Sequence, residues 1–125
     1  MNMKIKALVT GAILVSAHAM AANVPQELID LNIKACEQIK TSGLLAKDMY
    51  RPDAAHLTSF CTCTTETYFR KLLPESEWQE MRTNPARNIP NQGDSPDEVK
   101  AKRERMKAVG AAVHERQMQA ESACH

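Results

Sequence analysis

The cysteines are the residues of this chain whose type and spacing could do the most chemistry. There are four, at positions 36, 61, 63 and 124, and an even number in a short chain predicts a disulfide framework. Residues two apart on a helix point about 200° apart, so Cys61 and Cys63 cannot bond to each other within a helix. Each should bond a different one of Cys36 and Cys124, and both assignments remain open.

Cysteine pairs also serve redox catalysis and metal binding. Redox sites usually carry C-x-x-C at a helix N-terminus, where the dipole lowers a thiol pKa, whereas here the spacing is C-x-C inside a predicted helix. Cys61, Cys63, Cys124 and His125 offer a set of metal ligands, although zinc sites prefer C-x₂₋₄-C spacing. We expect structural disulfides and no bound metal, with two alternatives: a thiol–disulfide redox protein, or a periplasmic metal-binding protein that uses the C-x-C pair.

The first residues have the features of a secretory signal peptide. Lys4 and Lys6 precede an uncharged, mostly apolar run over residues 7–17, and residues 17–19 form an A-x-A cleavage site. The run is too short to cross roughly 30 Å of hydrocarbon. We expect residues 1–19 to be removed, with cleavage as late as residue 22. The mature protein would then have no membrane anchor and would lie in the periplasm or outside the cell.

Composition excludes several function classes for the mature chain. Loss of Lys4 and Lys6 from the 16 basic residues leaves 14 against 15 acidic residues, so no bulk charge recruits nucleic acid. Residues 100–107 form a basic run, but Glu104 interrupts it and we expect a solvated helix face. The sequence has four glycines, no G-x-S-x-G motif and no glycine-rich phosphate loop. We therefore expect neither catalysis nor a cofactor.

Helices must position these cysteines, because apolar and polar residues nowhere alternate in a sustained way. Proline, glycine and serine punctuation predicts helices over residues 24–42, 53–73, 75–82 and 95–124. A strand over residues 58–68 is the main rival, since threonine is frequent there. The expected fold is all-α: one domain over residues 20–125, a small bundle of about four helices stapled by two disulfides.

Helical spacing also predicts which residues face the core. The first helix should bury Leu28, Leu31, Ala35 and Ile39. The second should bury Leu57, Phe60, Cys61, Thr64, Tyr68 and Leu72. The last should bury Val99, Met106, Val109, Val113, Gln117, Ala120 and Cys124.

The sequence predicts how two of these helices end and begin. Gly43 suits the left-handed position after the first helix, with Leu44 supplying the accompanying hydrophobic contact. Ser95 should cap the last helix, with Pro96 in its first position and Glu98 completing a capping box.

Residues 84–94 contain two prolines, a glycine and three asparagines, which predicts a mobile loop. Loops on a rigid scaffold commonly carry function. The candidate contact surface is therefore Trp78 with Asn88 and Asn91, where an exposed tryptophan would anchor a partner. The competing interpretation places Trp78 in the core.

The segment from Ser59 to Cys63, followed by Thr65-Glu66 and by residues 73–78, resembles a known pattern. It is similar to an aromatic-C-x-C helix in a loose group of small exported bacterial helical proteins whose function is uncharacterised. The resemblance covers about residues 36–78 and the terminal cysteine. It implies an early and a late cysteine, as Cys36 and Cys124 are here, and it implies no active site.

These observations favour a non-enzymatic binding or interaction protein of the periplasm with a protein partner. An immunity-type inhibitor or an envelope accessory factor fits, because a small stapled scaffold loses little entropy when it binds. The sequence identifies neither the partner nor the oligomeric state.

Overall fold

The computed structural model describes residues 23–125, so the predicted signal peptide lies outside the described residues. Four α-helices and one π-helical segment follow in order: α2 (Gln26–Thr41), α3 (Leu57–Thr67), η2 (Tyr68–Leu72), α4 (Glu75–Thr83) and α5 (Pro96–Cys124). This part of the chain contains no strand, so the all-α prediction is confirmed and the rival strand over residues 58–68 is wrong. None of these helices is long and apolar enough to cross a membrane.

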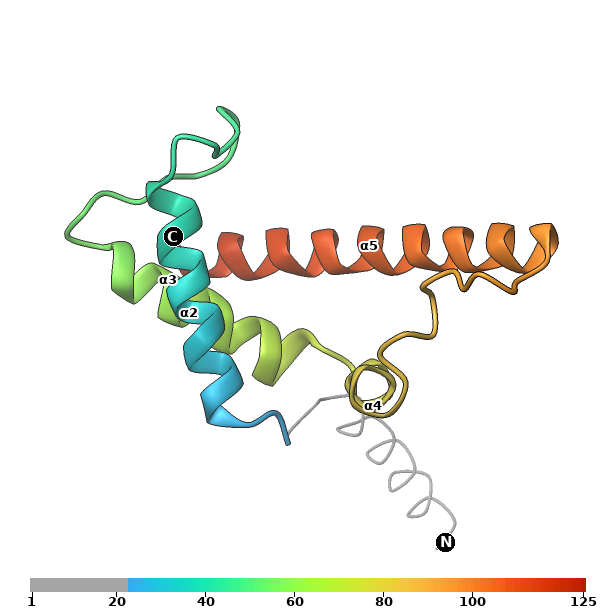
Figure 1. Ribbon diagram of the computed structural model, residues 1–125. Helices are drawn as coiled ribbons and strands as arrows, with labels where there is room; N and C mark the ends of the chain where they lie inside the picture. Colours follow the sequence, from blue (N-terminus) through green and yellow to red (C-terminus); the bar gives the residue numbers. More distant parts are fainter. Residues whose placement is uncertain (1–22) are drawn as a thin grey trace, which may run out of the picture.

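Helix α3 is the centre of the structure. Both α2 and the C-terminal part of α5 pack against it, and the three meet at one end of the molecule (Figure 1). From this junction α5 extends as a long straight helix, with α4 and the 84–94 segment leading back to its far end (Figure 1). The fold therefore has a packed end and a projecting helix.

The hydrophobic core is small and lies where these helices meet. Its buried members are Val24, Ile29, Tyr68, Leu73, Trp78 and Ala120. Leu28, Ile33, Phe69 and Leu72 pack against them at the edge. The cluster draws residues from α2, η2, α4 and α5 and from the segment before α2, whereas α3 buries Phe60, Cys61, Thr64 and Thr65 outside it.

The inward face of α2 differs from the predicted one. Ile29 is fully buried, whereas Leu31 and Ile39 of the predicted stripe are exposed. Ile29, Cys36 and Lys40 share the inner face, where Cys36 bonds α3 and Lys40 pairs with Glu121. Leu28 of the predicted stripe does pack against the core.

The end of α2 is also a correction. Gly43 has no positive φ and Leu44 is 93% exposed, so the predicted left-handed cap does not form. Instead Ser42 is extended, and the Arg51 guanidinium donates hydrogen bonds to the Lys40 and Ser42 carbonyls. A distant arginine satisfies the helix-end carbonyls that a glycine motif would otherwise serve.

Helix α3 begins at Leu57, four residues later than predicted, because residues 53–56 form a separate turn. The His56 N–H donates to the Asp53 carboxylate over 3.0 Å, which closes that turn. At its other end α3 continues as the π-helical segment η2, where the Leu73 N–H donates to the Tyr68 carbonyl five residues earlier. Pro74 follows directly and cannot continue the helix.

Helix α5 begins as predicted. The Glu98 N–H donates to the Ser95 hydroxyl over 3.1 Å, and the Ser95 N–H donates to the Glu98 carboxylate over 2.7 Å, which completes the capping box. The predicted apolar stripe is buried only at its end, at Ala120. Met106, Val109 and Val113 remain exposed because the part of α5 that carries them projects away from the core.

Candidate functional site

The four cysteines form two disulfides, Cys36–Cys61 and Cys63–Cys124. Each cysteine of the C-x-C pair thus bonds a different helix, as helix geometry predicts, and the structure resolves which one. Cys61 is fully buried, whereas Cys63 and Cys124 are half-buried. The sulfurs join α2 and α5 to opposite sides of α3, so their role in this structure is to hold the packed end together.

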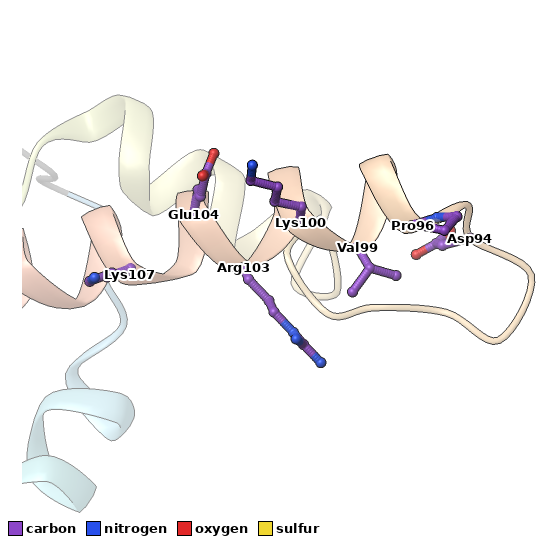
Figure 2. A pocket seen from close by; sticks show the side chains of 7 residues that line it. All are labelled: Asp94, Pro96, Val99, Lys100, Arg103, Glu104 and Lys107. Atoms are coloured by element: carbon purple, nitrogen blue, oxygen red, sulfur yellow. The ribbon is translucent and has the colours of Figure 1, made fainter.

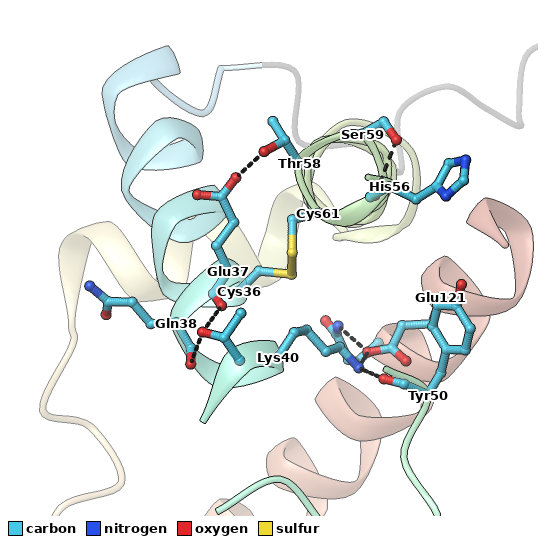
Figure 3. The surroundings of a disulfide bond; sticks show 12 residues. Cys36, Glu37, Gln38, Lys40, Tyr50, His56, Thr58, Ser59, Cys61 and Glu121 are labelled. Carbon is cyan, nitrogen blue, oxygen red and sulfur yellow. Dashed lines mark hydrogen bonds and ion pairs between the residues drawn. A yellow bond between two sulfur atoms is a disulfide. The ribbon is translucent and has the colours of Figure 1, made fainter. Parts of the chain in front are cut away.

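A charged pair lies beside the Cys36–Cys61 bridge and joins α2 to α5 (Figure 3). The Lys40 ammonium lies 3.1 Å from the Glu121 carboxylate, and both side chains are 4% exposed. Lys40 also donates to the Tyr50 carbonyl over 2.7 Å, and the Gln117 amide donates to the same carboxylate. Charges buried this deeply require such partners, so this pair specifies how α2 and α5 meet.

The C-terminal residue closes over the same region. The His125 ring stacks on Tyr50 with 4.1 Å between centroids. Tyr50 in turn contacts Phe60 at 4.9 Å. Lys40 lies over the Phe60 ring at 5.5 Å and donates to the Tyr50 carbonyl, so the rings adjoin the buried pair and the end of α5 belongs to the scaffold.

Trp78 belongs to the core, and its prediction as part of a contact surface is wrong. Its side chain is only 6% exposed and it belongs to the buried cluster. The Arg82 guanidinium lies over the ring at 5.9 Å. A mature domain with few aromatic residues needs its one tryptophan in the core, where a large ring buries the most area.

Asn88 and Asn91 lie in the 84–94 segment, which runs along the first turns of α5 (Figure 1). Asn88 accepts a hydrogen bond from the Arg105 guanidinium over 3.0 Å. The Asn91 N–H donates to the Asp94 carboxylate, which also pairs with Lys102 at 2.7 Å. Asn88 therefore attaches the segment to α5 directly, and Asn91 does so through Asp94.

The same contacts perturb one titratable group. The Asn91 N–H, followed by the Lys102 ammonium, lowers the pKa of Asp94 below its ordinary 3.8, because both stabilise the ionised carboxylate. In the turn that precedes α3, a hydrogen bond with the His56 side chain is the main cause that lowers the pKa of Asp53. Both carboxylates stabilise local structure.

The feature that sequence reasoning missed is the projecting part of α5, residues 96–113, which we call the arm. Met106, Val109 and Val113 are 45%, 42% and 38% exposed. With Val99 they follow spacings of seven, three and four residues, so they form one stripe along the arm. The heptad spacing was visible in the sequence, but its exposure was not.

Three cations lie on the arm outside this stripe, and Arg103 is the nearest to it. Lys100, Arg103 and Lys107 are exposed, and no described residue forms a hydrogen bond or ion pair with their side chains. We call them the arm cations. They line a shallow hollow of about 530 Å³ together with Val99, Pro96, Asp94 and Glu104. Figure 2 shows Val99 and Arg103 on one side of the helix, Lys100 and Glu104 on the other, and Lys107 further along.

The remaining chemistry of the described residues concerns metals. Residues 23–125 contain no group of three or more His, Cys, Asp and Glu side chains placed to hold a metal ion. All four sulfurs are oxidised, so the predicted alternative of a C-x-C metal site lacks its thiolate ligands. The arrangement that is available for chemistry is the arm, which offers apolar area and positive charge.

The chain was compared with protein families, curated proteins and solved structures. No family model, no curated protein and no solved structure matches it.

Proposed function

We propose that the mature chain is a non-enzymatic interaction protein of the periplasm, and that the arm is its contact surface. One observation carries this proposal: a capped helix projects from the core with its apolar stripe exposed. An apolar stripe at coiled-coil spacing gains stability only when another surface covers it. A partner that binds there would bury Met106, Val109 and Val113 together.

The location rests on two separate observations. Two disulfides indicate an oxidising environment outside the cytoplasm. The signal-like residues 1–19 favour the periplasm in particular, with export followed by cleavage. An immunity-type inhibitor or an envelope accessory factor would act in that compartment.

The thiol–disulfide alternative has less support. The two disulfides of this protein join cysteines that are 25 and 61 residues apart in the sequence. Redox catalysts instead usually close a C-x-x-C pair at a helix N-terminus, where the thiolate is stabilised. We therefore assign both bridges to the scaffold.

Site-specific photo-crosslinking in living cells tests the proposed function. A photoreactive amino acid would replace Val109 on the arm, and a matched variant would carry it at Leu44, which is 93% exposed and lies off the arm. We expect a discrete crosslinked product in the periplasmic fraction from position 109 only. The same products from both positions, or none from 109, would contradict an arm-based interaction function.

A further inference from the structure

Helix α5 is joined to the rest of the domain by few buried side chains. Of its 29 residues, only Ala120 and Glu121 are buried, and an alanine removes little apolar area from water. Glu121 is buried as one member of an ion pair, and desolvation offsets much of its attraction to Lys40. Arg116 pairs with Glu77, but both side chains are partly exposed and water screens the pair. These non-covalent contacts hold α5 only weakly, so its disulfide to α3 is its main attachment.

Helix α2 differs, because apolar packing holds it in addition to its bridge. Ile29 is fully buried, and Leu28 and Ile33 pack against the core at its edge. Val24, which lies just before the helix, is buried as well. Opening the bridge of α2 would therefore leave that helix in place, whereas opening the bridge of α5 would remove its main attachment.

The two bridges also differ in how readily a thiol could break them. Cys63 and Cys124 are both half-buried. In the other bridge Cys36 is half-buried and Cys61 is fully buried, so a thiol can reach only the Cys36 sulfur. Attack there would expel Cys61 as a thiolate into the interior, where burial disfavours the charge. The bridge of α5 is therefore the more reducible of the two.

One polar contact favours cleavage of the Cys63–Cys124 bond in a particular direction. The Thr67 hydroxyl lies 3.7 Å from the Cys124 sulfur, and only the hydroxyl can donate because both sulfurs are oxidised. A hydrogen-bond donor stabilises the thiolate that forms when a disulfide breaks, which makes that sulfur the better leaving group. Cys124 is therefore the leaving sulfur, and Cys63 is the sulfur that an incoming thiolate attacks.

We propose that Cys63–Cys124 is a redox-sensitive latch: a dithiol opens it selectively, and its opening releases α5 from the packed end. One thiolate of the dithiol attacks the Cys63 sulfur and forms a mixed disulfide, while Cys124 leaves as a thiolate and takes up a proton. The second thiol of the reductant loses its proton, attacks the mixed disulfide and frees Cys63. The dithiol is oxidised to a disulfide by two electrons, and the latch is reduced to two thiols.

The latch is compatible with a scaffold role for both bridges, because the closed bond holds α5 and only its opening changes the structure. Opening is also independent of the proposed interaction function. If the arm binds a partner, the latch adds regulation, since the arm belongs to α5 and is held at the core only while the bond is closed. Crosslinking at position 109 tests the interaction, whereas the tests of the latch use the protein alone, so the two can fail separately.

The first test measures how fast each bridge opens in the oxidised mature protein. Dithiothreitol is added at several concentrations, free thiols are alkylated at intervals, and peptide mapping assigns them. We expect Cys63 and Cys124 to be alkylated at least about tenfold faster than Cys36 and Cys61, at a rate that rises with dithiothreitol. Equal rates for both bridges, or rates limited by unfolding and independent of dithiothreitol, would overturn the proposal. A parallel reaction with reduced thioredoxin distinguishes a protein dithiol from a small one.

Thr67→Val tests the direction of attack, because it removes the hydroxyl and keeps the shape of the side chain. We expect it to slow the opening of the latch about threefold and to leave the Cys36–Cys61 bridge unchanged. The matched control is Thr62→Val, a half-buried threonine of the same helix whose hydroxyl has no hydrogen-bond partner among the described residues. Circular dichroism checks that both variants fold. A wild-type rate in Thr67→Val would contradict Cys124 as the leaving sulfur.

The second test asks whether opening releases α5. After selective opening and alkylation, hydrogen exchange over residues 96–124 should become at least about tenfold faster than in the oxidised protein, while α2 keeps its protection. Unchanged protection of α5 would show that its non-covalent contacts hold it without the bond. An equal loss of protection in α2 would show that the bond stabilises the whole domain. Either outcome would overturn the latch.

Discussion

The buried Lys40–Glu121 pair shows how single residues decide the packing of this small domain. Lys40 comes from α2 and Glu121 from α5, and their contact lies near the Cys36–Cys61 disulfide. One carboxylate oxygen of Glu121 has no hydrogen-bond partner within the described residues. Two charges that are largely removed from water attract each other strongly but also carry a large desolvation penalty. Such a pair contributes more to the choice of packing than to net stability.

Removing one member of this pair should therefore be more damaging than removing both. We expect Lys40→Met to lower the free energy of unfolding by about 3 kcal/mol, because Glu121 would be left buried without its ion-pair partner. The double variant Lys40→Met/Glu121→Met should be more stable than Lys40→Met. Urea unfolding measures both, and Lys34→Met, an exposed site on the same helix, is the control. Additive losses in the double variant would show that the pair is not coupled.

A second prediction at this scale concerns Asp94. The pKa of Asp94 is lowered in the folded state. Its contribution to the free energy of unfolding is therefore fully present above the ordinary pKa of 3.8 and is lost as the pH falls through the lowered pKa. We expect Lys102→Met to raise this pKa only in part, since the Asn91 N–H still donates to the carboxylate. Carbon-detected NMR titration measures the shift, with Lys107→Met as control. An Asp94 pKa unchanged by Lys102→Met would contradict the ion pair.

At the scale of elements, α5 is one continuous helix with two different environments. Its last turns are tied to α3 by Cys63–Cys124, to α4 by the ion pair of Arg116 with Glu77, and to α2 by Glu121. Nearer its start, Lys102 and Arg105 contact the 84–94 segment. A helix stabilised by packing at one end only should open more readily at the other.

Gly110 tests this division. It lies in the arm with ordinary helical backbone, and no atom lies within 4 Å of the place where a Cβ would stand. Gly110→Ala should stabilise the arm locally by about 1 kcal/mol, because glycine is the poorer helix former. Hydrogen exchange of residues 100–113 should slow, while the melting temperature changes little. A large rise in melting temperature would mean that the arm unfolds together with the core.

The two disulfides should divide the structure in the same way. By chain entropy the bridges stabilise the fold by about 3.5 and 4.3 kcal/mol for loops of 25 and 61 residues. Cys63→Ser/Cys124→Ser should speed hydrogen exchange mainly in α5, and Cys36→Ser/Cys61→Ser mainly in α2. Mass spectrometry of peptic fragments reports both, and paired substitutions avoid orphaned thiols. Equal effects on both helices from either variant would refute separate clamps.

At the scale of the whole molecule, the start of the domain limits where a signal peptide can be cut. Val24 is buried, and its carbonyl accepts a hydrogen bond from Arg70 over 2.8 Å. Cleavage must therefore occur before Val24 for the domain to keep its core. The A-x-A sites end at residues 19 and 21, so both leave this contact intact.

We expect the mature N-terminus to be Met20 or Ala22. Intact-mass measurement of protein from the periplasmic fraction distinguishes the two. Replacing Ala17 and Ala19 with bulkier residues should block or shift the cut, since the peptidase accepts small side chains there. A full-length species that fractionates with membranes would contradict export with cleavage.

The sequence was most informative where local chemistry dominates. The capping box at Ser95 and the break at Pro74 depend on neighbouring residues, and both lie where they were expected. The separate bonding of Cys61 and Cys63 follows from helix geometry alone. The inward residues of α2 were predicted only in part, because Leu31 and Ile29 belong to alternative stripes and the face that turns inward is the one that carries the tertiary contacts of Cys36 and Lys40.

The sequence by itself thus determined the helices, most of their ends and the rule that each C-x-C cysteine bonds a different helix, because these depend on the backbone and on neighbours. Only the tertiary structure decided which residues are covered. Trp78 went to the core, while the apolar stripe of the arm did not, although both are hydrophobic. Burial depends on where distant helices meet. Only the C-terminal end of α5 meets α2 and α3, so the part that carries the stripe lies outside this junction. That is why the candidate contact surface lies on the arm and not at Trp78.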